Sequence, residues 1–141
     1  FKEALDPAFR AYAAQIVRNA KTLAATLTSA GFRIVSGGTE NHMMLVDVAA
    51  AGLTGKDASA ALDAAGIIVN KNTIPFDSKS PFVTSGIRLG TPSVTTRGMG
   101  EAEMRQIGGW IVSILKAIGD TALQARIRGE VTALTSRFPV P

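Results

Sequence analysis

Cysteine is absent from the 141 residues of this chain. Its absence excludes a disulfide framework, a cysteine-ligated zinc site and a cysteine nucleophile. It also agrees with a reducing compartment, and we expect a cytoplasmic protein. Long hydrophobic runs are missing as well, because no apolar stretch approaches the roughly 18 residues that a membrane-spanning helix needs. We therefore expect no membrane partner.

Positive charge is only mildly in excess. The chain has 15 lysine and arginine residues against 11 aspartate and glutamate residues, which gives a net charge of +4. A nucleic-acid interface usually gathers its basic residues into one patch. Here they are scattered, and the densest group is Arg126, Arg128 and Arg137. This pattern indicates a solvated helix face, and we expect no nucleic-acid partner.

The apolar content is sufficient for a folded core. Hydrophobic residues make up 46% of the chain and charged residues 18%. This composition predicts a single ordered domain over residues 1–141. The first residue is Phe1 rather than an initiator methionine, and no signal segment follows it. We expect the chain to be a fragment or processed product of a longer protein.

Four segments have the spacing of apolar residues that is typical of helices. They run from Pro7 to the stop at Gly31, from Thr54 to Gly66, from Glu101 to Ile118, and from Asp120 through Leu134. Asp6, Thr54 and Asp120 are the expected N-cap residues. In the first helix the inward-facing positions are predicted to be Phe9, Tyr12, Ile16, Ala20, Leu23 and Leu27.

Four short segments between these helices are predicted strands: residues 32–35, 42–48, 67–70 and 86–91. The combination predicts an α+β fold in which helices pack on one face of a small, mostly antiparallel sheet. The other face of the sheet would then need a cover. A further domain or subunit of the parent protein is the expected one.

A long irregular loop at residues 71–84 leads into the strand GIRLGT. Loops longer than about 12 residues in a compact domain are usually functional. Alternation along the strand places Ile87 and Leu89 on one face and Arg88 on the other, over a surface that two glycines leave open. The planar fork of an arginine in such a place suits a carboxylate or a phosphate. A structural arginine paired with an acid is equally consistent with the sequence.

The same stretch carries a resemblance to a known family. SPFVTSGIRLGTPSVTTRG at 80–98 is similar to a distinctive segment of the serine hydroxymethyltransferases. NKNTIP at 70–75, SGGTENHMMLVDV at 36–48 and LTGKDASAAL at 53–62 fall in that family's order and spacing. The resemblance covers essentially the whole chain. It identifies the chain as the C-terminal domain of a fold-type I pyridoxal-phosphate enzyme.

The resemblance implies a reversible conversion of serine and tetrahydrofolate to glycine and 5,10-methylenetetrahydrofolate, with pyridoxal 5'-phosphate as cofactor. Arg88 stands where the family's arginine binds the α-carboxylate of serine or glycine. Ser80, Pro81 and Phe82 lie in the folate-binding segment, and Asn72 matches an asparagine close to the pterin.

The resemblance also implies that the family's large domain, with the cofactor lysine, lies outside this chain. We therefore expect no catalytic residue here and an inactive isolated chain, with a homodimer as the full-length enzyme. Two other interpretations stay open: the small domain of another pyridoxal-phosphate enzyme such as an aminotransferase, and a non-catalytic basic interaction module.

Two further residues bear on these interpretations. Phe76 departs from the small or polar residue that the family pattern predicts after the proline. His42 is the only histidine and has no metal-ligand partner at helical spacing, so we expect it to have a structural role and the chain to hold no metal site.

Overall fold

The computed structural model describes all of residues 1–141. The helices are α1 (Pro7–Ser29), α2 (Gly55–Ala64), α3 (Pro92–Thr96), α4 (Glu101–Lys116) and α5 (Thr121–Arg137), and the strands are β1 (Arg33–Ile34), β2 (Met43–Asp47), β3 (Asn70–Asn72) and β4 (Gly86–Gly90). Single turns of 3-10 helix occur at Glu3–Leu5, Val35–Gly37 and Ala49–Ala51. None of the helices is both long and apolar enough to cross a membrane.

The four strands form one antiparallel sheet in the order β1-β2-β4-β3. β4 is central, and Arg88 in it lies opposite Leu45 of β2 and Asn70 of β3. Ile87 and Leu89 are buried whereas Arg88 is exposed, as the alternation predicted. The predicted α+β class and the mostly antiparallel sheet are confirmed.

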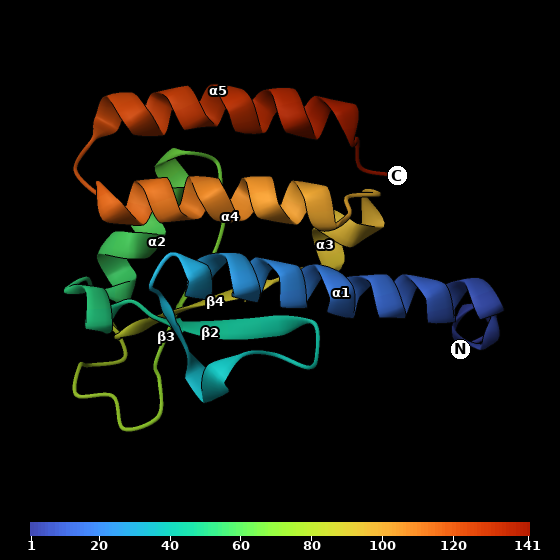
Figure 1. Ribbon diagram of the computed structural model, residues 1–141, viewed down its shortest axis with the longest axis horizontal. Coiled ribbons are helices and arrows are strands. Elements are labelled where there is room, and N and C mark those ends of the chain that lie inside the picture. The colour runs from blue at the N-terminus through green and yellow to red at the C-terminus, as the bar shows by residue number, and fades with distance from the viewer.

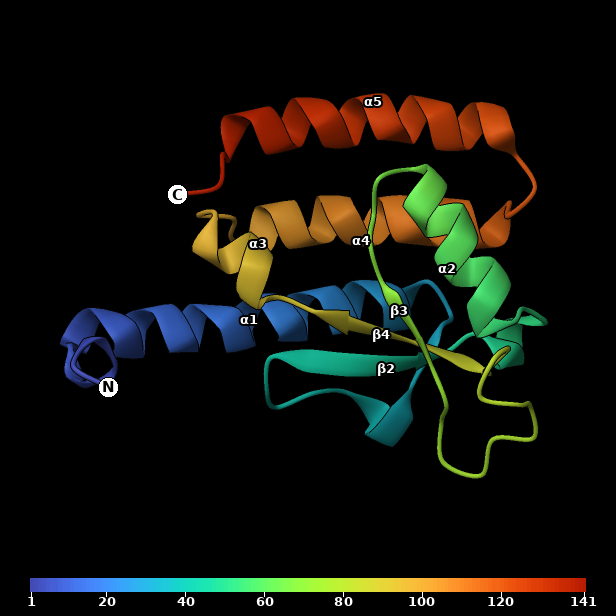
Figure 2. The same cartoon turned by 180° about the vertical axis from the view of Figure 1, so that it is seen from behind.

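The helices cover one side of the sheet in layers (Figures 1 and 2). α1 and α2 contact the strands directly, α4 packs over both of them, and α5 lies outermost against α4 and α2. The two termini lie at the same end of the molecule (Figure 1).

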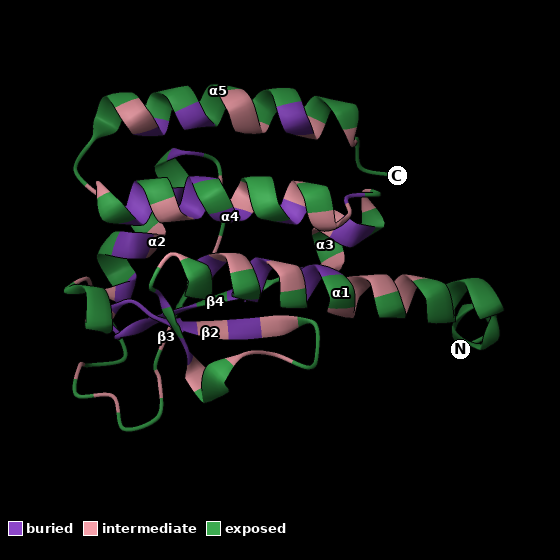
Figure 3. Cartoon of the chain, in the orientation of Figure 1, coloured by how far each residue is buried: buried purple, intermediate pink, exposed green.

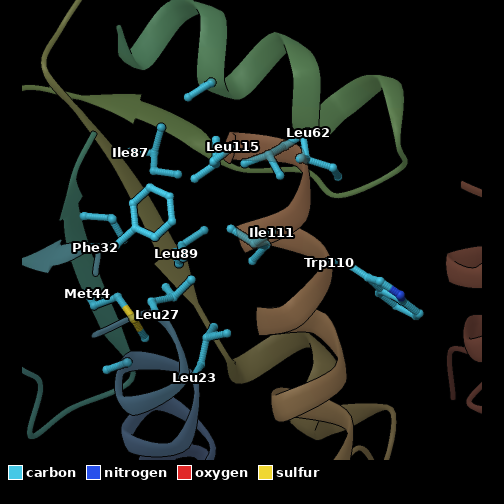
Figure 4. Packing of buried hydrophobic residues seen from close by; sticks show 14 of the residues in the cluster. Leu23, Leu27, Phe32, Met44, Leu62, Ile87, Leu89, Trp110, Ile111 and Leu115 are labelled. Carbon is cyan, nitrogen blue, oxygen red and sulfur yellow. The ribbon is translucent and has the colours of Figure 1, made fainter. Parts of the chain in front are cut away.

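The core lies between the sheet and these helices. Its labelled side chains in Figure 4 come from the sheet and from α1, α2 and α4, with Ile87 and Leu89 of β4 facing Ile111 and Leu115 of α4. Trp110 lies on the other side of α4, where its indole N–H donates to the Glu130 carboxylate of α5 at 2.6 Å. Trp110 thus packs between α4 and α5.

The predicted helix starts are confirmed by their caps. The Asp6 side chain accepts a hydrogen bond from the N–H of Ala8, and the Asp120 side chain accepts one from the N–H of Leu123. The Thr54 hydroxyl accepts one from the N–H of α2's third residue. Each bond satisfies a helix N–H that has no partner within its own helix.

The third strand begins three residues after the start of the predicted range 67–70. β3 is Asn70–Asn72, and only these residues pair with β4. Ile67 and Val69 pack against the core without strand pairing, while Ile68 is exposed. The apolar run therefore reflects partial burial against the core rather than membership of the sheet. Part of the predicted loop at 71–84, Lys71 and Asn72, belongs to a strand.

Two other features differ from the expectations. The short helix α3 was not expected, and it begins at Pro92 because proline suits the first position of a helix. Phe9 was expected to face inward, yet it is 44% exposed. The first turns of α1 extend beyond the body of the molecule, where no other element covers them (Figures 1 and 3).

Candidate functional site

The candidate site lies on the sheet face opposite the helices, and Arg88 is its central cation. Arg88 is exposed in the middle of β4. It takes part in none of the three salt bridges of the chain and in none of its side-chain hydrogen bonds. The guanidinium therefore has all its donors available for a ligand or another part of the protein.

The two glycines beside Arg88 have different surroundings. A Cβ on Gly90 would meet only ordinary contacts, the nearest being the His42 carbonyl oxygen at 3.5 Å. A Cβ on Gly86 would lie 2.6 Å from Cγ2 of Ile74 and 2.9 Å from the Asn72 carbonyl oxygen. The expected open surface thus exists on the Gly90 side. On the Gly86 side the loop closes over the sheet.

Asn72 shares this face with Arg88. It pairs with Gly86 in the register of β3 and β4, two residues along the strand from the pair of Asn70 with Arg88. Residues two apart on a strand point to the same face. The Asn72 amide donates to the carbonyl of Thr73 at 2.7 Å, and its side chain is half-buried. The structure therefore brings Asn72 and Arg88 onto one surface.

Ser80, Pro81 and Phe82 lie in the second half of the loop and are exposed. The Lys71 ammonium donates to the Phe82 carbonyl at 2.8 Å, which joins this segment to β3. None of the hydrogen bonds of the chain connects the three residues to Arg88. The structure therefore shows no direct polar contact between these three residues and Arg88.

The loop is organised around one carboxylate, that of Asp77. One oxygen, Oδ1, accepts from the Lys79 N–H at 2.9 Å and from the Ser85 hydroxyl at 2.6 Å. The other, Oδ2, accepts from the Ile74 N–H at 3.2 Å and from the Ser85 N–H at 2.9 Å. These donors come from the start, the middle and the end of the loop.

The same bonds shift the titration of Asp77. The Ser85 hydroxyl and the Lys79 N–H hold the pKa of the Asp77 carboxyl well below its ordinary value, against a smaller opposing effect of desolvation. Hydrogen bonds to the ionised form always act in this direction. The carboxylate is therefore ionised at neutral pH.

The end of the loop is attached to the start of α2. The N–H of Gly55 donates to the Thr84 carbonyl at 3.0 Å, and the N–H of Lys56 donates to the Val83 carbonyl at 2.9 Å. A Cβ on Gly55 would overlap the Thr84 hydroxyl oxygen and the Gly86 carbonyl. A glycine at position 55 is thus required for this close approach.

Phe76 lies at the corner of a turn in the loop that the Asp77 N–H closes by donating to the Ile74 carbonyl at 3.1 Å. Its φ is 60°, which is uncommon for a bulky residue, and its side chain is fully exposed. This backbone conformation is the reason why the turn favours a small or polar residue at this position.

Sequence reasoning did not single out Asp77 or Gly55. A signal was present, because an aspartate followed two residues later by a free backbone N–H is typical of an Asx turn, and Asp77 with Lys79 is one. The sequence gives no comparable signal for Gly55, because the atoms that approach it belong to Thr84 and Gly86, which lie far from it in the chain.

The remaining candidates do not form a second site. His42 precedes β2, and its carbonyl accepts from the Thr91 N–H at 3.0 Å. No group of three or more histidine, aspartate or glutamate side chains is placed to hold a metal ion. The polar groups of the candidate site are therefore Arg88 and those of the loop.

Comparison with known proteins adds to this geometry. A family model described as serine hydroxymethyltransferase matches residues 1–111. "Serine hydroxymethyltransferase 1" of Pseudomonas aeruginosa is 53% identical over 140 residues, which cover 99% of this chain and 34% of the relative. The chain thus spans about a third of the length of that relative, in its C-terminal segment.

Proposed function

Because the chain belongs to the serine hydroxymethyltransferase family, we propose that within its full-length protein it serves the reversible conversion of serine and tetrahydrofolate to glycine and 5,10-methylenetetrahydrofolate. Its share is to bind and orient the two substrates. Positioning of this kind supplies a large part of many rate enhancements. The observation that carries the proposal is the exposed guanidinium of Arg88, which has no acidic partner in the chain.

Arg88 is proposed to bind the α-carboxylate of serine or glycine. Its fork can donate two parallel hydrogen bonds to the two oxygens of a carboxylate. β4 holds it in place from both sides, through its pairing with β2 and β3. Gly90 next to it leaves room for a ligand.

The loop is proposed to form part of the tetrahydrofolate site. Ser80, Pro81 and Phe82 are exposed in it, and Asn72 lies at its start on the face of Arg88. The exposed ring of Phe82 can pack against a flat heterocycle. These roles extend the family assignment to single residues of this chain.

Pyridoxal 5'-phosphate is proposed to be held mainly by the part of the protein that lies outside this chain. The cofactor acts as an electron sink in enzymes of its class and is bound through a lysine. None of the six lysines of this chain is buried. The residues present therefore do not fit a cofactor site by themselves, and we expect the isolated chain to be inactive. The full-length enzyme is proposed to be a cytoplasmic homodimer.

Replacement of Arg88 tests the proposal in the full-length protein. Arg88→Lys keeps the charge but loses the two-pronged geometry, so the KM for serine should rise at least about tenfold. Arg88→Ala should be worse, because each charged hydrogen bond to a carboxylate contributes about 1.5–3 kcal/mol. Steady-state turnover at varied serine measures both.

The matched control is Arg105→Lys, since Arg105 is an exposed arginine of α4 that makes no side-chain hydrogen bond or salt bridge. This variant should leave the KM for serine and kcat unchanged. The cofactor absorbance should be the same in every variant. A normal KM and kcat in Arg88→Lys would show that this arginine does not bind substrate, and the assignment would be wrong.

A further inference from the structure

We propose that Asp77 is the positioning residue of the tetrahydrofolate loop. The inference rests on the function proposed above for residues 73–85. Its carboxylate holds the loop in the shape that presents Ser80, Pro81 and Phe82 beside the strand of Arg88. Asp77 itself does not contact a substrate in this role.

The first argument is the reach of the four hydrogen bonds. They connect Asp77 to Ile74 before it and to Lys79 and Ser85 after it. A single side chain therefore closes the loop from both directions. The cost in conformational entropy of ordering a loop of this length is offset where one group satisfies several of its backbone N–H groups.

The second argument is that no other side chain of the loop forms hydrogen bonds to both its first half and its end. The Asn72 amide donates only to its neighbour's carbonyl, and the Thr84 hydroxyl donates to the Gly86 carbonyl. The side chains of Ser78 and Ser80 form no hydrogen bond. Without the Asp77 carboxylate, the loop would be held by its turns, by the bond from Lys71 to Phe82 and by the two backbone bonds that attach Val83 and Thr84 to α2, and no other hydrogen bond would connect its first half to its end.

The third argument is that the charge and shape of a carboxylate are both needed. Each of its oxygens accepts two hydrogen bonds, and all four partners are donors. An asparagine has only one acceptor oxygen, and its NH2 group would face two backbone N–H groups in one orientation of the amide and the Lys79 N–H in the other. Asp77→Asn should therefore loosen the loop although its size is nearly unchanged.

Loss of the Asp77 hydrogen bonds should weaken the binding of tetrahydrofolate more than the binding of serine. Ser85 precedes β4, but β4 is held independently by its ladders with β2 and β3. Arg88 should therefore keep its place when the loop loosens. Ser80, Pro81 and Phe82 have no such ladder, and their position depends on the loop.

The test uses the full-length enzyme with Asp77→Asn, Asp77→Ala and the control Asp63→Asn. Asp63 is an exposed residue of α2 whose carboxylate forms no hydrogen bond or salt bridge, so its replacement makes the same change of charge. The KM for tetrahydrofolate should rise about tenfold or more in both Asp77 variants, because a displacement of about 1 Å can cost as much as a hundredfold. The KM for serine and the cofactor absorbance should stay at their wild-type values.

Hydrogen–deuterium exchange gives a readout that does not depend on turnover. The amides of residues 73–85 should exchange faster in Asp77→Asn, while those of β2 should not change. Ser85→Ala, which removes one of the four bonds, should give a smaller effect in the same direction. Asp63→Asn should exchange as the wild type does.

Three results would overturn the inference. One is an unchanged KM for tetrahydrofolate in Asp77→Asn, and a second is unchanged exchange of the loop. The third is a parallel rise of both KM values with loss of the cofactor absorbance, because Asp77 would then serve only general stability. If the wild-type full-length protein did not convert serine at all, the proposed function would fail by itself, and the exchange experiment would still decide whether Asp77 holds the loop.

Discussion

Two adjacent glycines of α4 allow the packing of the molecule to be tested by one pair of substitutions. Gly108 is buried against α1, and a Cβ there would lie 2.7 Å from Cγ2 and 3.0 Å from Cβ of Thr26, and 3.3 Å from Cδ1 of Leu23. Gly109 is exposed, and a Cβ there would meet nothing within 4 Å. The same change to alanine should therefore have opposite effects at the two positions.

Gly109→Ala should stabilise the chain by about 0.5–1 kcal/mol, because alanine loses less backbone entropy than glycine when a helix forms. Gly108→Ala has the same advantage but must push α1 away from α4. Overpacking of this kind costs about 1–3 kcal/mol. The two variants should thus differ by about 1–3 kcal/mol in the free energy of unfolding, with Gly108→Ala the less stable one.

Thr26 cannot easily move aside. Its hydroxyl donates to the Thr22 carbonyl at 2.9 Å, and this bond holds its methyl group towards Gly108. Replacing Thr26 by serine removes that methyl group, so the double variant with Gly108→Ala should recover part of the lost stability. The coupling between the two changes then measures the contact itself.

Urea unfolding of the chain, followed by circular dichroism and by the fluorescence of its single tryptophan, gives these free energies. The slope of the transition should stay the same, because the surface exposed on unfolding hardly changes. If Gly108→Ala proved as stable as Gly109→Ala, the close approach of α1 and α4 at this point would be refuted.

Three further predictions concern Asn19, Gly55 and Asp77. Asn19→Ala should destabilise the chain by about 2–3 kcal/mol in urea unfolding, because the buried Met99 carbonyl loses the amide that donates to it at 2.9 Å; a loss within experimental error would contradict this. Gly55→Ala should cost about 3 kcal/mol and speed amide exchange around Thr84, and normal exchange there would count against the attachment of the loop. The pKa of Asp77 is lowered by folding, so its stabilising effect is complete above the unfolded pKa of about 3.9 and is lost as the pH falls below it. Wild type and Asp77→Asn should therefore approach each other in stability below about pH 4, and a constant difference would contradict the role of the charge.

Local patterns in the sequence predicted much of the fold. The caps at Asp6, Thr54 and Asp120 need only a side-chain oxygen two or three residues before a backbone N–H, and all three are present. The exposure of Arg88 between two buried neighbours follows from the period of two along any strand. These features depend on neighbours in the chain, so the sequence alone determined them.

The roles of Arg88, Asn72 and the segment Ser80–Phe82 came from the resemblance to a family. The family is confirmed, whereas the roles of these residues stay predictions. Physical reasoning from the residues could say only that an arginine beside glycines suits an anion.

Only the tertiary structure decided the features that depend on distant partners. Ile67 and Val69 look like a strand but are partly buried against the core, and pairing with β4 begins only at Asn70. The closure of the loop around Asp77 needs donors as far away as Ser85, and its attachment to α2 needs Gly55. Burial and hydrogen bonding of this kind depend on which residues come close together in the folded protein. A sequence pattern can predict such contacts only when the partners are a few residues apart in the chain.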